Sequence, residues 1–282
     1  MDRNVPDSAL NPELISNLMS PGARLQLSQL TVLDSVDSTN SALQKLPARE
    51  QHAHVILAES QSKGRGQRAR QWYSPPGCNI YLSLGWQVTI GKHHLSNIPL
   101  LTAVCTCRAL ARAGLQKHGI KWPNDILVSG RKLAGILVET QAAAGGPATA
   151  VIGLGVNVNM PPGSPQQQEA DRSIDREWTD LTSELGGAEP VSRNAVTALL
   201  LEELIEGLRN WQDTGFASFR ADWEARDLLS GRKVELQHRD SVIAGVVRGI
   251  DEAGGLLLER SESVSAKAPE VFHAGEVRVF HD

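Results

Sequence analysis

The chain has 282 residues, which is enough for one large domain and one small domain with a sizeable buried core. Its composition, 41% hydrophobic and 21% charged, is ordinary for a soluble globular protein, and its net charge of −4 provides no global positive field that would attract nucleic acid. The first twenty residues lack the apolar core and basic start of a secretory signal, and no stretch approaches the ~20 apolar residues that span a bilayer.

In chain order, the first pattern predicts a short helix near residues 12–19. A strand follows at 30–36, and Ser38-Thr39-Asn40 then opens a helix that stops at Pro47. A strand is then expected at 54–60, followed by a polar loop without apolar periodicity at 61–79. A second strand is expected at 79–88 and a long helix at 95–117.

The second half begins with short strands, expected at 119–123, 125–128, 132–140 and 150–159, with a turn at 141–149 between the last two. Residues 161–171 are rich in Pro, Gly, Gln and Ser and are typical of a surface loop. Helical patterns return at 176–185, 193–211 and 215–226. Here Trp178, Trp211 and Trp223 occupy helical positions, and we expect them to anchor the core.

After residue 229 the pattern changes to short β-rich runs separated by glycine or polar turns, at 231–237, 242–251, 254–260 and 276–280. The Ser-rich stretch at 261–269 is expected to be a surface turn. Such a series of short strands and turns is typical of a small β-barrel. We therefore expect an α+β chain in three parts: an N-terminal segment (1–28), a mixed α/β body (29–228) and a β module (229–282).

The cysteines indicate the compartment. Cys78, Cys105 and Cys107 form an odd, sparse set without a CxxC pair, which fits a reducing environment better than a disulfide framework. We therefore expect a cytoplasmic protein, with the three thiols used in packing.

The segment Lys63–Arg70 concentrates four positive charges in eight residues. Gly64 and Gly66 allow close approach of the backbone to a ligand, and Arg65, Arg68 and Arg70 offer forked donors for carboxylate or phosphate oxygens. The alternative is a solvated surface loop. Its partial match to a dinucleotide fingerprint is rejected, because no helix can open in GQRARQWYSPPG. No P-loop motif occurs either.

Two further segments carry candidate ligand contacts. In Lys121-Trp122-Pro123-Asn124-Asp125 the proline breaks the strand ladder, and Asn124 and Asp125 can face a ligand, with Asp125 as an oxygen ligand for Mg²⁺. The alternative is a polar turn. Lys132 opens an apolar strand, either as a solvated end or as a point charge on a phosphate or carboxylate. Glycines inside the strands, at 135, 153 and 155, would leave space for a flat ligand.

Six segments, taken in chain order, make the chain closely resemble the biotin protein ligase family over residues 30–282: STN, GRGQRARQW, KWPND, KLAGILVE, IGLGVNVN and GIDEAGGLLLE. The resemblance implies a catalytic domain related to the class II synthetase fold, with a mixed sheet, and a C-terminal SH3-like β-barrel. It implies an ATP-dependent biotin ligase that forms biotinyl-5′-AMP and transfers biotin to a lysine of the biotin carboxyl carrier protein of acetyl-CoA carboxylase. ATP and biotin would be substrates, with Mg²⁺, and the protein would be a monomer or homodimer.

By the same resemblance, the residues that contact biotin or its adenylate are Ser38, Thr39, Asn40, Gln61, Arg65, Gly66, Gln67 and Lys132. Those near the adenine end are Trp72, Asn124 and Asn157, and Asp125 is near Mg²⁺. To these the residue patterns add Gly64, Arg68, Arg70, Gly135 and Gly153. We assign the catalytic roles to Lys132 and Arg65 and expect both to converge on one cavity.

Two departures from the family pattern are evident. The family often has arginine where this chain has Gln67, and glycine where it has Ala69. Only 37 residues precede Ser38, fewer than the DNA-binding domain and linker of bifunctional relatives require, so we expect no DNA partner and no repressor role. Two alternatives stay open: a lipoate or octanoate ligase on the same core, and a binding module without catalysis.

Overall fold

The computed structural model describes residues 9–89, 93–142, 147–160, 177–187, 189–260 and 268–280. The predicted turn at 141–149 falls partly outside these ranges, as does the Ser-rich stretch at 261–269, and the predicted loop at 161–171 lies wholly outside them.

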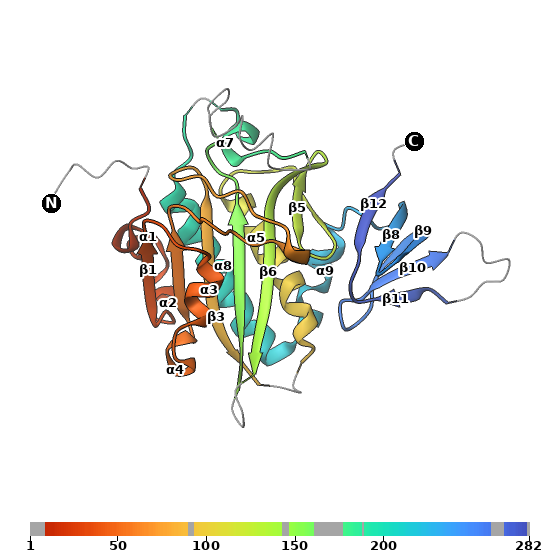
Figure 1. Ribbon diagram of the computed structural model, residues 1–282, viewed down its shortest axis with the longest axis horizontal. Coiled ribbons are helices and arrows are strands. Elements are labelled where there is room, and N and C mark those ends of the chain that lie inside the picture. Colours follow the sequence, from red (N-terminus) through yellow and green to blue (C-terminus); the bar gives the residue numbers. More distant parts are fainter. Residues whose placement is uncertain are drawn as a thin grey trace.

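A seven-stranded mixed sheet forms the centre of the larger part (Figure 1). Its strands are β1 (Gln29–Leu33), β2 (His54–Ala58), β3 (Ile80–Val88), β4 (Gly119–Lys121), β5 (Asp125–Val128), β6 (Arg131–Ala142) and β7 (Ala148–Val156). Their spatial order is β1-β2-β3-β7-β6-β5-β4, and only the β1–β2 pair is parallel. The mixed sheet expected for this fold is therefore confirmed.

The helices among the described residues surround this sheet. They are α1 (Pro12–Leu18), α2 (Pro21–Arg24), α3 (Thr39–Gln44), α4 (Ala48–Gln51), α5 (Ile98–Arg112), α7 (Leu181–Glu184), α8 (Arg193–Thr214) and α9 (Arg220–Glu224), with short 3₁₀ turns η1 (Gln67–Ala69), η2 (Leu95–Asn97) and η3 (Phe216–Phe219). Caps define both ends of the longest one: the Ser192 side chain accepts from the Ala195 amide at its start, and at its end Gly215 has a φ of +72° and donates its backbone amide to the Trp211 carbonyl.

The two faces of the sheet have different roles. Because side chains alternate along a strand, Leu82 and Leu154 face the main core with the leucines of α5 and α8. Their neighbours Ser83 and Gly153 point to the opposite face, where α3 packs. The buried face is thus apolar, and the α3 face carries small and polar residues that leave room for a site.

A second, antiparallel sheet follows the body (Figure 1). Its strands are β8 (Lys233–His238), β9 (Ser241–Ile250), β10 (Leu256–Arg260), β11 (Glu270–Phe272) and β12 (Glu276–Val279), in the order β11-β10-β9-β8-β12. The four predicted strands are present, and β11 is an additional one. Val234, Leu236 and Leu258 are fully buried and give this sheet an apolar face that continues the main core.

The turn between β9 and β10 attaches the second sheet to the body. Five consecutive carbonyls, from Ile250 to Gly254, accept hydrogen bonds from body side chains. Arg220 donates to the first two at 3.1 and 2.7 Å, and the other donors are Asn97 (3.1 Å), Ser96 (2.6 Å) and Trp122 (3.0 Å). Gly254 has a φ of +81°, and a Cβ there would lie 2.6 Å from Asn97 Oδ1. Trp122 therefore joins the two sheets.

One helix prediction is wrong. Of the segment expected to be helical at 176–185, residues 177–185 are described, and within them only Leu181–Glu184 forms a helix, which Asp180 caps by accepting from the Ser183 amide. Trp178 lies in an extended segment that bridges to Lys132 and is half-buried, so it is not a core anchor. Trp211, Trp223 and the three cysteines are buried, as predicted. Among the described residues, no helix has the length and apolar character to cross a membrane.

Candidate active site

The glycine-arginine segment forms a small hairpin within an otherwise irregular loop. The Gly66 amide donates to the Arg70 carbonyl at 2.7 Å, and the Trp72 amide donates to the Gly64 carbonyl at 2.9 Å. A Cβ at Gly64 would collide with the Trp72 carbonyl, which explains the glycine. At its tip Arg68 and Ala69 have φ values of +59° and +57°, a conformation that costs roughly 1–2 kcal/mol per L-residue. Glycine in place of Ala69 would avoid that strain.

A continuous polar cluster forms at the start of α3. Gln61 Oε1 accepts from the Thr39 amide at 2.9 Å, and Gln61 Nε2 donates to Ser74 Oγ at 3.0 Å. Ser83 Oγ lies 2.8 Å from Thr39 Oγ1 and 2.6 Å from Asn40 Oδ1. Ser38, Thr39 and Asn40 are all at most 4% exposed, so the predicted STN motif forms a preorganised wall of polar groups.

The glycines in β6 and β7 accommodate side chains of the site. A Cβ at Gly155 would lie 2.6 Å from the Trp72 indole, and one at Gly135 would lie 2.9 Å from it. A Cβ at Gly153 would collide with Asn40 Oδ1. Trp72 thus fills the space that the sequence assigned to a flat ligand, and its ring becomes a surface of the site.

Lys132 lies at an irregularity of the sheet. The β5–β6 register shifts between Ile126 and Leu127, and Lys132 pairs through its backbone with the extended segment at 177–179. A bulge of this kind re-aims a side chain. The Lys132 ammonium lies 2.7 Å from Asp125 Oδ1 and 5.2 Å from the centre of the Trp72 ring.

Two asparagines hold the backbone around these groups. Asn124 Nδ2 donates to the Ile136 carbonyl at 2.7 Å, and Asn157 Nδ2 donates to the Thr179 carbonyl at 3.1 Å. Both are buried, and both line the larger cavity described next. Each amide therefore has a structural partner in addition to any ligand.

Two cavities open on the α3 face of the sheet. The smaller has an empty volume of about 470 Å³ and includes the polar cluster, and the larger one has about 900 Å³. The two cavities share Gly66, Gln67, Trp72, Asn124 and Lys132. Arg65 and Lys132 both line the smaller cavity, so the predicted convergence is confirmed.

Almost every predicted site residue lies on these cavities. The smaller one is lined by Ser38, Thr39, Asn40, Gln61, Arg65, Gly135 and Gly153, and the larger one by Arg68, Arg70, Asp125 and Asn157, in addition to the shared residues. Gly64 lines neither, and instead borders a wide groove outside them. The predicted residues therefore gather around two adjoining cavities.

Two carboxylates of the chain pair with the three arginines of the loop. Arg65 makes a two-point ion pair with Glu139, at 2.9 and 2.7 Å. Arg68 and Arg70 share Glu276 Oε2 of β12, at 3.1 and 2.7 Å. The second sheet thus contributes a residue to the wall of the larger cavity.

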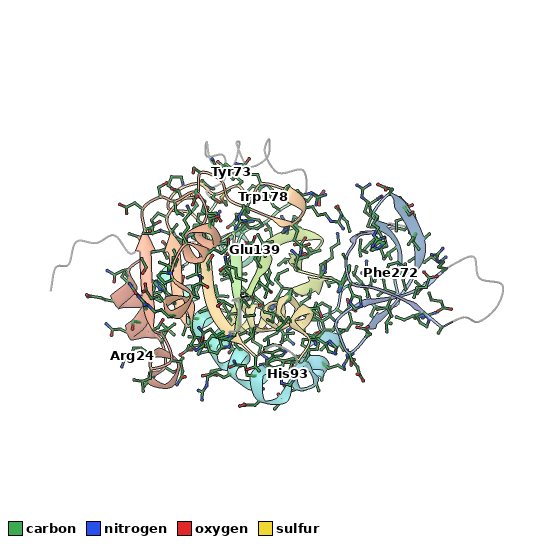
Figure 2. The ribbon with its side chains drawn as sticks, turned by 60° about the horizontal axis from the view of Figure 1, so that its bottom comes forward. Arg24, Tyr73, His93, Glu139, Trp178 and Phe272 are labelled. Carbon is green, nitrogen blue, oxygen red and sulfur yellow. The ribbon has the colours of Figure 1, made fainter. Side chains whose placement is uncertain are left out.

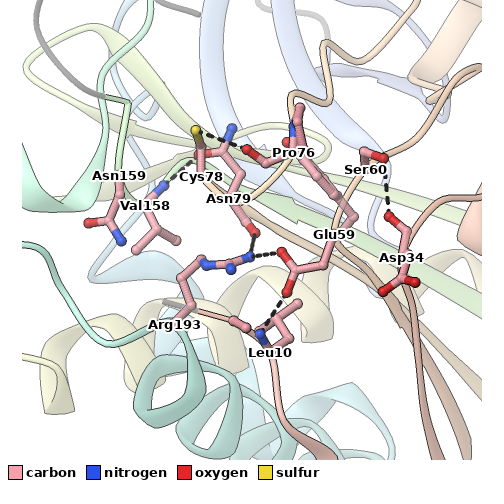
Figure 3. Close-up of polar contacts among 12 residues, drawn as sticks. Leu10, Asp34, Glu59, Ser60, Pro76, Cys78, Asn79, Val158, Asn159 and Arg193 are labelled. Atoms are coloured by element: carbon pink, nitrogen blue, oxygen red, sulfur yellow. Dashed lines mark hydrogen bonds and ion pairs between the residues drawn. The ribbon is translucent and has the colours of Figure 1, made fainter. Parts of the chain in front are cut away.

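A buried ion pair supports the ends of the strands behind the site (Figure 3). Arg193, 1% exposed, pairs with Glu59 at 2.8 Å and donates to the Asn79 carbonyl at 3.1 Å. Glu59 also accepts from the Leu10 amide, and Asn79 accepts from the Val158 amide. These contacts join the residues next to Gln61 and Asn157, and so fix where both emerge from the sheet.

The described residues contain no preformed cluster of protein ligands for magnesium. They contain no group of three or more His, Cys, Asp or Glu side chains that could hold a metal ion. Asp125, the predicted ligand, is engaged by Lys132. Because proteins commonly hold Mg²⁺ through one or two carboxylates together with substrate phosphates, Mg²⁺ would have to enter as a complex with its nucleotide.

Several residues of the site carried no sequence signal. Tyr73 and Trp178 lie next to each other at the edge of the larger cavity (Figure 2), and they pack with Cys78 and Met160. Tyr81 lines the smaller cavity, where burial raises its pKa well above the ordinary value, and its hydroxyl donates to the Pro75 carbonyl. Ser83, Glu139 and Glu276 were also missed, because each occupies an ordinary strand position.

Comparison with protein families gives two matches. Residues 32–157 match the model described as "Biotin/lipoate A/B protein ligase family". Residues 229–279 match the model described as "Biotin protein ligase C terminal domain".

Known proteins agree with this result. The chain is 34% identical to the bifunctional ligase/repressor BirA of Escherichia coli over 255 residues, which cover 90% of this chain and 75% of that protein. It is 32% identical to the biotin--[acetyl-CoA-carboxylase] ligase of Mycobacterium tuberculosis over 254 residues, 87% of this chain and 89% of that one. The structure of biotin protein ligase from Aquifex aeolicus in complex with biotin and ATP superposes with a TM-score of 0.73 at 24% identity, covering 91% of this chain and all of that one, which shows a shared fold.

Proposed function

Because the chain belongs to the biotin protein ligase family, we propose that this biotin ligase joins biotin to ATP as biotinyl-5′-AMP and then transfers biotin to one lysine of a carrier protein. The observation that carries the proposal is the convergence of Arg65 and Lys132 on one cavity that shares five lining residues, Lys132 among them, with a second cavity. Two linked sites are what a reaction between two small molecules requires.

The chemistry of each cavity supports an assignment of the substrates. The smaller cavity presents amide and hydroxyl groups of Ser38, Asn40 and Gln61, which suit the ureido group and carboxylate of biotin. The larger cavity combines the Trp72 and Trp178 rings with the cations Arg68 and Arg70, which suit adenine and phosphates. Lys132 lies at their junction, where the biotin carboxylate would meet the α-phosphate.

In the first step, a biotin carboxylate oxygen attacks the α-phosphorus, and the bond to the bridging oxygen breaks, so that pyrophosphate leaves with the electron pair. No proton is transferred. Both reactants are anions, so the site has to compensate negative charge, and Arg65 and Lys132 would do so. One well-placed donor of this kind is worth about 3 kcal/mol. Mg²⁺ brought in with ATP would supply further charge compensation on the phosphates.

In the second step, the neutral amine of a carrier lysine attacks the acyl carbon of the adenylate. The bond from that carbon to the phosphate oxygen breaks, AMP leaves with the electron pair, and the new amide nitrogen loses one proton to solvent. The loop at 63–70 borders both cavities, and it would cover the mixed anhydride and exclude water before that attack. We propose the biotin carboxyl carrier protein of acetyl-CoA carboxylase as the carrier, on the names of the relatives from Mycobacterium tuberculosis and Paracoccus denitrificans. The three unpaired thiols support a reducing, cytoplasmic compartment.

Exchange of labelled pyrophosphate into ATP tests the proposal, with biotin, lipoate and octanoate offered in turn. Exchange with biotin alone is the expected result. Exchange with lipoate or octanoate alone would assign the chain to the other branch of its family, and no exchange with any acid would favour a binding module. Transfer is then measured with labelled biotin and a purified carrier domain, with a carrier whose target lysine is replaced by arginine as the control.

A further inference from the structure

Glu139 of β6 has no assigned role, although it contacts two predicted biotin-binding residues. Its two carboxylate oxygens face the two terminal nitrogens of Arg65, at 2.9 and 2.7 Å. The side chains are 29% and 37% exposed, at the rim of the site (Figure 2 labels Glu139). A fork-to-fork pair of this kind constrains direction as well as distance, so it fixes the Arg65 guanidinium against the sheet.

The same carboxylate orients Asn40. Asn40 Nδ2 donates to Glu139 Oε2 at 2.8 Å, while Asn40 Oδ1 lies 2.6 Å from Ser83 Oγ. A donor on one side and an acceptor on the other select one orientation of the amide. Glu139 thus connects the cationic loop to the polar cluster of α3.

This arrangement sets up a competition. An anion that takes the same fork of Arg65 has to replace the Glu139 carboxylate, because both terminal nitrogens already point at it. When part of the protein has its binding group occupied, the apparent affinity for the ligand falls in proportion to the fraction of protein whose group remains free.

We propose that Glu139 is a positioning residue that holds Arg65 until the anionic group of the substrate takes its place. The inference rests on the proposed function, in which Arg65 binds the carboxylate of biotin or the phosphate of its adenylate. Binding then exchanges one ion pair for another, and Asn40 keeps its hydrogen bond to Glu139. Because Arg65 is paired with an anion both before and after binding, the loop stays ordered and the guanidinium charge is never left without a partner.

Salt dependence follows from this exchange. When one ion pair replaces another, the number of pairs is unchanged, and added salt has little effect on affinity. With Glu139→Gln, binding creates an ion pair that did not exist before, and salt should weaken it. Glutamine has the size of glutamate and still offers an oxygen to Asn40, so the fold is preserved.

The first experiment measures biotin binding by titration calorimetry at about 0.03 and about 0.3 M NaCl. Glu139→Gln should bind biotin about 2- to 5-fold more tightly than the unchanged protein at low salt, and this advantage should shrink at high salt. Glu259→Gln is the matched control, because Glu259 forms an exposed pair with Arg248 at 2.6 Å on the second sheet, and it should behave like the unchanged protein.

The second experiment does not depend on biotin. Trypsin cleaves after Arg65, Arg68 and Arg70 once the loop opens, so Glu139→Gln should be cut there several-fold faster than the unchanged protein or Glu259→Gln, in the absence of substrates.

The two readouts together decide the proposal. Faster cleavage with tighter, salt-sensitive binding supports it. Faster cleavage with weaker binding would show that Glu139 only anchors the loop, and unchanged cleavage would show that it does not hold Arg65; either overturns the proposal. If the unchanged protein binds no biotin, the proposed function itself fails, while the cleavage rates still report whether Glu139 holds the loop.

Discussion

The Lys132 ammonium group lies 2.7 Å from the Asp125 carboxylate, across the β5–β6 pair, at the junction of the two cavities. The lysine side chain is 20% exposed and the aspartate 9% exposed, so the pair is largely shielded from water. The pair holds the cation at the position where the carboxylate and the α-phosphate would meet.

Replacement of this lysine tests its role directly. We expect Lys132→Ala to lower biotin-dependent ATP–pyrophosphate exchange by about 100-fold or more, because one charged donor at the reacting centre is lost. Circular dichroism should remain native, since the backbone contacts of Lys132 are unchanged. Lys233→Ala, on an exposed position of β8, is the control and should keep full exchange. Near-normal exchange in Lys132→Ala would remove this residue from the mechanism.

Two glycines of β7 should affect the two substrates differently. A methyl group at Gly153 collides with Asn40, whereas one at Gly155 lies 2.6 Å from the Trp72 indole. We therefore expect Gly153→Ala to raise mainly the KM for biotin, by about 10-fold, and Gly155→Ala, which displaces the Trp72 ring that both cavities share, to raise the KM values for biotin and ATP alike, each on the scale of a lost contact of about 1.4 kcal/mol.

The control for these variants is Gly22→Ala, because a Cβ there has no neighbour within 4 Å. It should leave both KM values unchanged. Equal effects of Gly153→Ala and Gly155→Ala on both substrates would contradict the assignment of one cavity to each substrate.

The thiols give a test of packing. Burial raises the pKa of Cys107 to about 12 and raises that of the Cys105 thiol above its ordinary range. Thiolate is the reactive form, so native protein at pH 8 should react with iodoacetamide far more slowly than unfolded protein. Mass spectrometry after labelling in denaturant should show three modified cysteines, and rapid native labelling of Cys105 or Cys107 would argue against this core.

The turn that joins the two sheets can be tested by stability. Gly254→Ala places a left-handed residue and a clashing methyl group against Asn97, and we expect a loss of roughly 2–4 kcal/mol in the free energy of unfolding. Gly249→Ala has the same type of conformation, with a φ of +95° and no neighbour within 4 Å, so it should lose only the conformational part, roughly 1–2 kcal/mol. Equal losses measured by urea unfolding would show that the turn is not tightly held.

Much of the fold could be predicted because each segment with a clear hydrophobic periodicity is bounded by residues that favour turns or helix ends. Alternation located β3, and a run of apolar residues at helical spacing located α5. Trp178 was misplaced because its surroundings also fit a helix, and only the backbone pairing with Lys132 shows why the segment is extended. The sequence around Trp178 does not reveal this contact with a distant residue.

The candidate site was predicted less completely, for a related reason. Arg65 and Lys132 stand in unusual motifs, so the sequence singled them out. Glu139, the carboxylate partner of Arg65, occupies an ordinary position within β6, and Glu276 opens a strand more than 200 residues from the loop that it contacts. Such partners emerge only when the topology brings distant segments together.

The row of five carbonyls from Ile250 to Gly254 has a consequence for cooperativity. Four body side chains satisfy these acceptors, so separation of the small sheet would expose them all at once and uncover Trp122. The small sheet and the body should therefore melt as a single thermodynamic unit, with one calorimetric peak whose van't Hoff and measured enthalpies agree.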